Sequence, residues 1–550
     1  MLYVEKISRA ESFSDLVNIS MTILKESNPV GSTNMGIIIY NNLWPDISKH
    51  GVDHDIRTLN AIKSKLQEFS PTDENQDDYH LLSWFLEINL HELERLRWWE
   101  SAHYLSSTIL SGIISLTRKK VPDQTSRVRS IIARLRSISP LIKGEQRRII
   151  EPVTIWTEVE INNINGLIDY LEGVPELFKQ ESETLLDELT KTIEYAQNEL
   201  KNHLIWLNQL DGGPIRTRPE AYSELLEKRK IGLNVEELEQ LGWDYLESTL
   251  NEMQDLANNI HNGNVEELRK LIRMDHAKDF DEVIQHYQLL ADKARKFLID
   301  KEIVTMPKER LEIIRTPGPM KKFLSIAAAG MPGRFDEDQT GYFYCTVHDD
   351  LSMLEEHSFA YQPLLIAHES YPGHHLHGAA KNIHPSMVRT NIFSHPSPNT
   401  GLMYSSKLAD ITEGWGLYTE EMMWKAGYEN DPDNPNLRQR FLQVNAARWR
   451  AARIVIDTQL HTGRMSFDEA VNFLMDKTGY HKKTATAELM MYSRSPGYFS
   501  SYLLGKHQLT ELRKKTKNLI SDQEYHDQII YAGNVPYWFI EKKILENLNQ

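Results

Sequence analysis

Helical periodicity over most of the chain is the feature that most restricts its fold. From about residue 56 to residue 315, apolar residues recur every three or four positions, and charged residues fall between them on the outer face. The clearest stretches are 105–116, 160–171, 182–207 and 235–260. Proline- and glycine-containing turns separate the helical segments. This pattern predicts a helical scaffold whose apolar stripes form a core.

The character of the sequence changes near residue 316. Proline- and glycine-rich loops at 316–319 and 329–333 precede 340–347, which is rich in aromatic and β-branched residues and predicts a strand or short hairpin. Helical periodicity resumes at about 359 and continues to the end. We therefore predict a mainly α protein with a small β element near 340–347. We divide it into an N-terminal helical scaffold, 1–315, and a helical catalytic region, 316–550.

Composition excludes several classes of function. The formal net charge of −16 argues against nucleic acid as a partner, because a phosphate backbone requires a basic surface. Cys345 is the only cysteine, so the chain has no intrachain disulfide, and any metal must bind mainly to histidine and carboxylate groups. No apolar run approaches the roughly 20 residues that span a bilayer, and residues 1–6 carry no secretion signal. We expect a cytoplasmic protein without membrane contact; its oligomeric state stays open.

The stretch 368–375 reads His-Glu-Ser-Tyr-Pro-Gly-His-His and follows an apolar run. A histidine followed directly by glutamate, with more histidines within two turns, is typical of a zinc hydrolase, in which imidazoles hold the metal and the glutamate handles the proton of an activated water. The usual spacing is His-Glu-x-x-His, but the fourth position after His368 is Pro372. We predict His368 as the first ligand and Glu369 as the general base.

The second ligand depends on how the chain passes the proline. Pro372 and Gly373 could allow the helix to absorb two extra residues in a bulge or kink. His374 would then take the role of the missing histidine, with His375 as its neighbour. His375 stays open as an alternative ligand, because it lies seven residues after His368 and a straight helix would place both on one face.

A catalytic zinc ion usually has three protein ligands and one open position. Glu413 is the best third candidate, since it lies 39 residues after His374 and can come from a separate helix. Glu420 lies seven residues further on the same face, and Glu421 is adjacent. One arrangement has Glu413 as ligand with Glu420 or Glu421 supporting it, and the reverse is possible. We expect one Zn²⁺ per chain.

The two motifs, His-Glu-x-x-Pro-Gly-His-His and Glu-Gly-Trp-x-x-Tyr-x-Glu, resemble those of the bacterial family known as domain of unknown function 885 (DUF885). This is a group of predicted zinc peptidases related in pattern to the gluzincins. The resemblance covers most of the chain and implies a large multi-helix, peptidase-like fold. In gluzincin aminopeptidases the third ligand is a glutamate on a separate downstream helix, and the matching position is Glu413. The chain departs from the family pattern at Gln459, Met491 and Tyr498, outside the metal motif.

Three further residues are candidates for the substrate site. Tyr502 could donate a hydrogen bond to the oxyanion, although a core tyrosine is an equal alternative. Arg453 could bind a substrate carboxylate as a bidentate fork, with an ion pair to Asp457 as the alternative. His461 lies four residues after Asp457 on the same predicted helix and is a further candidate.

These features predict a zinc-dependent hydrolase that cleaves amide bonds of short peptides, a metallopeptidase for which carboxypeptidase-like cleavage is one form. A first alternative is a zinc amidohydrolase acting on a small amide-containing metabolite in a biosynthetic or tailoring pathway. A second alternative is a helical scaffold that binds a metal without catalysis. Glu369 argues against the second alternative, because a structural metal site does not use a general base.

Overall fold

Helices form most of the molecule, as the periodicity predicts. The computed structural model describes residues 2–322, 324, 326–390, 397–431 and 433–548, and it is 67% helix and 4% strand. The four clearest predicted stretches are helices α6 (Leu105–Arg118), α9 (Thr154–Gly173), α10 (Glu183–Leu207) and α12 (Val235–Ile260). The predicted mainly α fold with a small β element is confirmed. Among the described helices, none combines the length and apolar character needed to cross a membrane.

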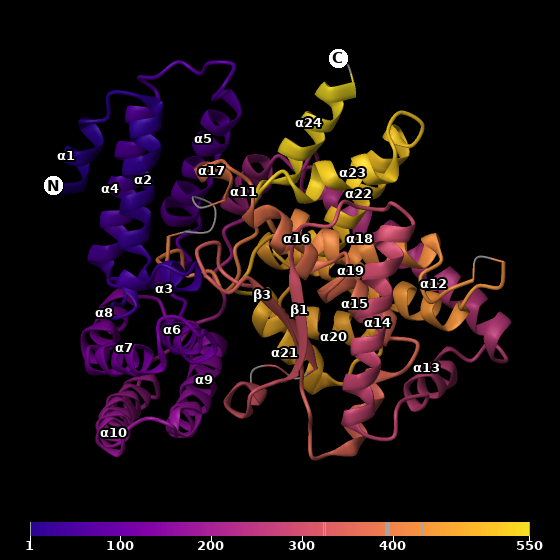
Figure 1. Ribbon diagram of the computed structural model, residues 1–550, viewed down its shortest axis with the longest axis horizontal. Helices are drawn as coiled ribbons and strands as arrows, with labels where there is room; N and C mark the ends of the chain where they lie inside the picture. Colours follow the sequence, from indigo (N-terminus) through magenta and orange to yellow (C-terminus); the bar gives the residue numbers. More distant parts are fainter. Residues whose placement is uncertain (1, 323, 325, 391–396, 432, 549–550) are drawn as a thin grey trace.

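The N-terminal helices lie together on one side of the molecule, coloured indigo to purple in Figure 1. Helices α6 to α10 enclose a hydrophobic core of their own. Besides those already given, the helices of this side are α1 (Leu2–Ser8), α2 (Phe13–Ser27), α3 (Pro29–Asn34), α4 (Lys49–Leu66), α5 (Gln76–His91), α7 (Gln124–Arg136) and α8 (Ile138–Arg148).

The remaining helices make up the rest of the molecule together with the small sheet (Figure 1). They are α11 (Pro219–Arg229), α12, α13 (Val265–Met274), α14 (Phe280–Asp300), α15 (Gln362–Glu369), α16 (His374–Asn382), α17 (Met387–Thr390), α18 (Ala409–Ala426), α19 (Leu437–His461), α20 (Phe467–Thr478), α21 (Lys482–Tyr492), α22 (Ser501–Thr516), α23 (Asp522–Ile530) and α24 (Tyr537–Leu548).

The sheet has three strands in the order β1-β3-β2, and only β3 (Thr340–Cys345) matches the β element expected from the sequence. Strand β1 (Arg310–Arg315) runs parallel to β3, and β2 (Ala327–Gly330) runs antiparallel to it, with Ala329 opposite Phe343. The sequence gives little sign of β2, because three alanines favour helix over strand. Strand β2 forms one edge of this sheet.

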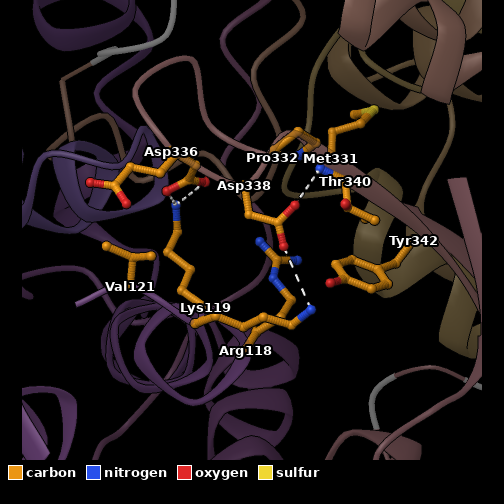
Figure 2. A pocket seen from close by; sticks show the side chains of 12 residues that line it. Arg118, Lys119, Val121, Met331, Pro332, Asp336, Asp338, Thr340 and Tyr342 are labelled. Atoms are coloured by element: carbon orange, nitrogen blue, oxygen red, sulfur yellow. Dashed lines mark hydrogen bonds and ion pairs between the residues drawn. The ribbon is translucent and has the colours of Figure 1, made fainter. Parts of the chain in front are cut away.

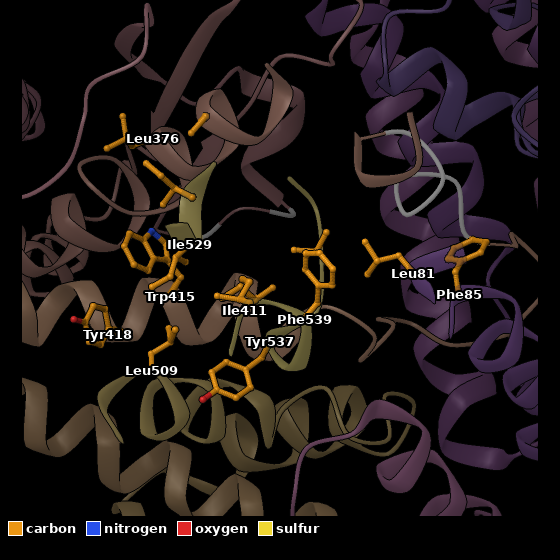
Figure 3. Close-up of a cluster of buried hydrophobic side chains, with 14 of the residues drawn as sticks. Leu81, Phe85, Leu376, Ile411, Trp415, Tyr418, Leu509, Ile529, Tyr537 and Phe539 are labelled. Atoms are coloured by element: carbon orange, nitrogen blue, oxygen red, sulfur yellow. The ribbon is translucent and has the colours of Figure 1, made fainter. Parts of the chain in front are cut away.

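The expected division at residue 315 does not coincide with a gap between cores. It would separate β1 from its partner β3, and α12 from α19, along which it packs. The largest hydrophobic cluster joins both regions. Figure 3 shows side chains of α5, such as Leu81 and Phe85, continuing through Phe539 to Trp415 on α18. The two halves therefore share the largest core of the molecule.

An ion pair ties the N-terminal helices to the loop after β2. Lys119, at the end of α6, lies 2.6 Å and 2.5 Å from the two carboxylate oxygens of Asp336 and donates to the carbonyl oxygen of Asn34 (Figure 2). Burial lowers the pKa of Lys119, and the adjacent carboxylate opposes that shift. Such a half-buried pair fixes the position of the loop that connects β2 to β3.

Helices α18 and α22 approach closely because glycines face each other at their contact. A Cβ atom on Gly414 would lie 2.5 Å from the Cα of Gly505, and one on Gly505 would lie 1.8 Å from the carbonyl oxygen of Asp410. Neither position has room for a methyl group unless the helices move apart.

Replacing Gly414 by alanine is therefore expected to lower the free energy of unfolding by roughly 1–3 kcal/mol, the usual cost of overpacking. The matched control is Gly144→Ala in α8, where the added Cβ would meet Ser48 at an ordinary 3.4 Å. The control should be neutral or stabilising by up to about 1 kcal/mol, because alanine favours helix. Denaturant unfolding measures both; equal effects would contradict the close contact.

Candidate metal centre

The chain breaks between two helices at the proline of the first motif. Helix α15 ends at Glu369 and α16 begins at His374, so the expected bulge within one helix is instead a four-residue turn. A Cβ on Gly373 would lie 1.7 Å from the carbonyl oxygen of His368, so the turn requires glycine there. The break brings the rings of His368 and His374 edge to face, with centroids 4.8 Å apart.

Helix α18 carries the second motif and holds this turn in place. The indole Nε1 of the fully buried Trp415 donates to the carbonyl oxygen of Pro372 at 2.9 Å. Thr419 Oγ1 donates to the carbonyl oxygen of Ala367, also at 2.9 Å. Gly416 leaves room for a ligand ring, since a Cβ there would lie 2.7 Å from an atom of His368. One helix face therefore positions the end of α15.

Three side chains from α15, α16 and α18 converge. One potential ligand atom from each of His368, His374 and Glu413 lies within 4.8 Å of the other two. His374 Nε2 and Glu413 Oε2 are 3.7 Å apart. Ligand atoms at tetrahedral zinc lie about 3.3 Å apart, and two imidazoles with one carboxylate are a donor set that zinc accepts. The arrangement therefore fits zinc after a small inward shift.

Glu420 supports His368 from behind. Glu420 lies on α18, one turn after Gly416. Its Oε1 is 2.7 Å from His368 Nδ1. A carboxylate at Nδ1 favours the tautomer with its proton on that nitrogen, which leaves Nε2 free to bind a metal. Of the two arrangements considered from the sequence, the structure brings Glu413 to both histidines and Glu420 to His368 alone. Glu421 instead forms ion pairs with Lys506 and Arg440.

Glu413 is held as a carboxylate. Tyr498 donates its hydroxyl hydrogen to Glu413 Oε1 at 2.6 Å, and His374 faces the other oxygen. Burial would raise the pKa of Glu413, but hydrogen bonding and the charges of the histidines lower it to about 2. Burial would lower the pKa of His374, yet its interactions with Glu413 and Glu369 raise it. Both shifts follow in part from the close His374–Glu413 contact.

His375, the alternative ligand, points elsewhere. Its Nε2 lies 2.9 Å from Glu309 Oε2, and its ring is buried. The same carboxylate accepts hydrogen bonds from Tyr371 and Arg295. Burial would raise the pKa of Glu309, but the bonds from His375, Tyr371 and Arg295 lower it. This cluster fixes the start of α16, and none of its members belongs to the convergent trio.

A cleft of about 440 Å³ opens beside the trio, a size typical of small-molecule sites. Glu369 lines it, and its Oε2 accepts a hydrogen bond of 2.9 Å from the backbone N–H of Ala329 on the edge strand β2. The lining residues are Ala328, Ala329, Met331, His368, Glu369, His374, Thr412, Glu413, Trp449, Arg450, Arg453 and Tyr502.

Tyr502 faces the cleft, as a substrate contact would require. Burial, together with the charge of Glu413, raises its pKa, so the phenol keeps its proton at neutral pH. Tyr498 packs edge-on against it, with ring centroids 5.9 Å apart. Tyr498, which donates to Glu413, therefore supports the tyrosine ring that lines the cleft.

Arg453 also lines the cleft, but its guanidinium already has partners. Its Nε donates to Tyr492 Oη at 2.8 Å, and one terminal nitrogen lies 3.2 Å from Glu488. The guanidinium carbon lies 3.9 Å from the ring centroid of Trp449. The intrahelical pair with Asp457 that the sequence suggested is not formed; Glu488 takes that place.

His461 lies away from the cleft. It is buried, with Nε2 3.4 Å from Asp457 Oδ1 and 3.3 Å from the carbonyl oxygen of Tyr492. Asp457 in turn accepts bonds from the Gly497 N–H and the Ser500 hydroxyl. His461 thus lies beside Asp457, which binds the turn before α22. Its position does not fit the substrate contact expected from the sequence, because it does not line the cleft.

Three residues with clear structural roles were not identified from the sequence. Tyr498 was noted only as a departure from the family pattern, although a tyrosine two residues after a proline in a turn is well placed to reach a neighbouring helix. Trp415 lies within the second motif, but its bond to the turn has no sequence signal. Glu309 stands in a charged stretch before β1 and resembles a solvent-exposed residue.

Comparison with known proteins agrees with this architecture. The model of a family described as "Bacterial protein of unknown function (DUF885)" matches residues 29–544. A structure described as "a putative lipoprotein of unknown function from Shewanella oneidensis" is 20% identical, covers 98% of this chain and 100% of its own, and has a TM-score of 0.76. "The putative lipoprotein from Colwellia psychrerythraea" is 14% identical, with coverages of 98% and 99% and a TM-score of 0.78. Comparison with curated proteins gives no match.

Proposed function

The chain belongs to the DUF885 family, and we propose that it is a zinc-dependent hydrolase that cleaves amide bonds of short peptides. The convergence of His368, His374 and Glu413 from three helices, with Glu369 facing the same cleft, is the observation that carries this proposal. Isolated buried charges are costly, so a site that gathers them beside an open cleft favours function over structure.

The three convergent residues would hold the metal, and Glu420 would orient His368. When bound, zinc supplies Lewis-acid chemistry that polarises the scissile carbonyl and lowers the pKa of water to roughly 7. Glu413 would give the divalent ion a negatively charged ligand, because its lowered pKa keeps it ionised. Tyr498 holds its other carboxylate oxygen.

Glu369 is the proposed general base. Its Oε2 is held by the N–H of Ala329, which fixes the carboxylate and leaves Oε1 to take a proton from the attacking water. The water oxygen forms the new bond to the carbonyl carbon, the carbon–nitrogen bond breaks, and Glu369 returns the proton to the leaving amine. Tyr502 keeps its proton and can donate a hydrogen bond to the oxyanion.

The size of the cleft favours short substrates. Its volume of about 440 Å³ lies within the range of small-ligand sites. Ala328 and Ala329 of the edge strand β2 line it, together with the aromatic side chains of Trp449 and Tyr502. A small amide metabolite would fit the same space, so amidohydrolase activity is the second outcome to be tested.

Metal analysis and product profiling test the proposal together. We expect purified protein to contain about one zinc ion per chain, and a chelator to remove both the metal and the hydrolysis of a mixed short-peptide library. Readdition of zinc should restore activity. Full metal occupancy with no peptide cleavage but with cleavage of small amides would favour the amidohydrolase. Protein that binds no divalent metal would contradict the proposal.

A further inference from the structure

The cleft contains two arginines whose surroundings differ. Arg453 is almost fully buried, and its charge is balanced by Glu488. Arg450 lies three residues earlier on α19 and lines the same cleft. Residues three apart on a helix share a face, so both side chains point to the substrate space. Their burial and their electrostatic partners distinguish them, because Arg450 is only partly buried.

Arg450 has no carboxylate partner among the described residues. One terminal nitrogen donates to the carbonyl oxygen of Ala446 at 3.3 Å, within its own helix. Its Nε is shielded from water and has no acceptor. The rings of Trp449 and Tyr502 lie 4.9 Å and 5.8 Å from the guanidinium. Loss of water around an uncompensated cation is unfavourable, and an incoming anion would offset it.

The planar guanidinium restricts which anion fits. Arginine presents parallel N–H donors that match the two oxygens of a carboxylate, and such charge-assisted pairs are about twice as strong as neutral hydrogen bonds. The acidic groups that also line this cleft, Glu369 and Glu413, are engaged by Ala329 and by Tyr498 with His374 respectively. A substrate carboxylate would therefore find Arg450 as its unpaired partner in the cleft.

We infer that Arg450 binds a carboxylate of the substrate, and that the cleft selects peptides carrying a negative charge near the scissile bond. This inference rests on the proposed function, because it assumes that the substrate lies beside His368 and Glu369. The carboxylate can be the C-terminus of the peptide or an acidic side chain. Both present the same two oxygens to the guanidinium.

Calorimetric titration of three peptides separates these sources. The probes are acetyl-Ala-Ala-Ala, its C-terminal amide, and acetyl-Ala-Glu-Ala amide, titrated into zinc-loaded protein carrying Glu369→Gln so that none is cleaved. We expect at least one anionic peptide to bind about 10- to 100-fold more tightly than the neutral amide. If only the free acid binds more tightly than the neutral amide, Arg450 recognises the C-terminal carboxylate. If the glutamyl amide binds as tightly as the free acid, Arg450 recognises any carboxylate near the scissile bond. Equal binding of all three would overturn the inference.

Variants of α19 locate the effect. In the Glu369→Gln protein, a second substitution, Arg450→Gln, should abolish the preference for the anionic peptides and leave binding of the neutral amide unchanged. Arg450→Lys should retain part of that preference. The matched control is Arg448→Gln on the same helix, whose side chain does not line the cleft. A preference that survives Arg450→Gln would also overturn the inference. Carboxylate binding that depends on Arg450, in a protein that cleaves no peptide, would contradict only the proposed function.

Discussion

Replacing Glu369 by glutamine is expected to reduce peptide hydrolysis by about 10²- to 10⁴-fold, the usual contribution of a general base, while the protein keeps its zinc. The amide has nearly the shape of the carboxylate but cannot accept the proton of the attacking water. Glu369 is not one of the three convergent groups, so its loss removes no ligand atom. Steady-state kinetics and metal analysis of the same preparation measure both effects.

Two comparisons make the result specific. Glu369→Asp keeps the carboxylate but withdraws it by one methylene group, so we expect activity between those of the wild type and the glutamine variant. The thermal midpoint should change little in the glutamine variant, because its amide oxygen can still accept the N–H of Ala329. Hydrolysis at the wild-type rate would show that another group takes the proton.

The helical fold could be predicted because its signal is local. Apolar stripes at helical spacing defined α10 and α12 to within a residue at each end. The strands β1 and β2 could not be predicted in the same way, because their sequences, Arg-Leu-Glu-Ile-Ile-Arg and Ala-Ala-Ala-Gly, carry no clear alternation. Those segments are strands because β3 offers hydrogen-bonding partners, and such pairing depends on tertiary context.

The candidate site shows the same division between local and non-local information. The adjacent His368 and Glu369 can be recognised from the motif alone, and the distance in sequence to Glu413 indicates a separate helix. Which way each histidine turns depends on the break after α15, which requires Gly373 and is held by the bond from Trp415. Likewise, only the fold shows that Arg453 has a carboxylate partner, Glu488, while Arg450 has none among the described residues. Contacts between residues far apart in the sequence depend on the tertiary structure, and no fixed spacing in the sequence predicts them.

Replacing His374 by alanine is expected to bring the zinc content of the protein from about one per chain towards zero and to abolish hydrolysis. Two of the three convergent groups would remain, one short of the usual protein ligand set of catalytic zinc. His375→Ala provides the matched control, since it removes the same side chain one position later. His375 is bonded to Glu309 and lies outside the convergent trio, so this variant should keep its metal.

The two variants should also differ in how much they change the stability when metal is absent. In chelator, His375→Ala should lower the free energy of unfolding by roughly 1–3 kcal/mol, because Glu309 loses one of its buried hydrogen-bond partners. His374→Ala should change it less, because without metal its main partner, Glu413, still accepts the hydroxyl of Tyr498. Denaturant unfolding in the presence of chelator measures the free energy of unfolding, and metal analysis without chelator measures the zinc content. Loss of zinc in the His375 variant, with retention in the His374 variant, would reverse the ligand assignment and require α16 to rotate about its axis.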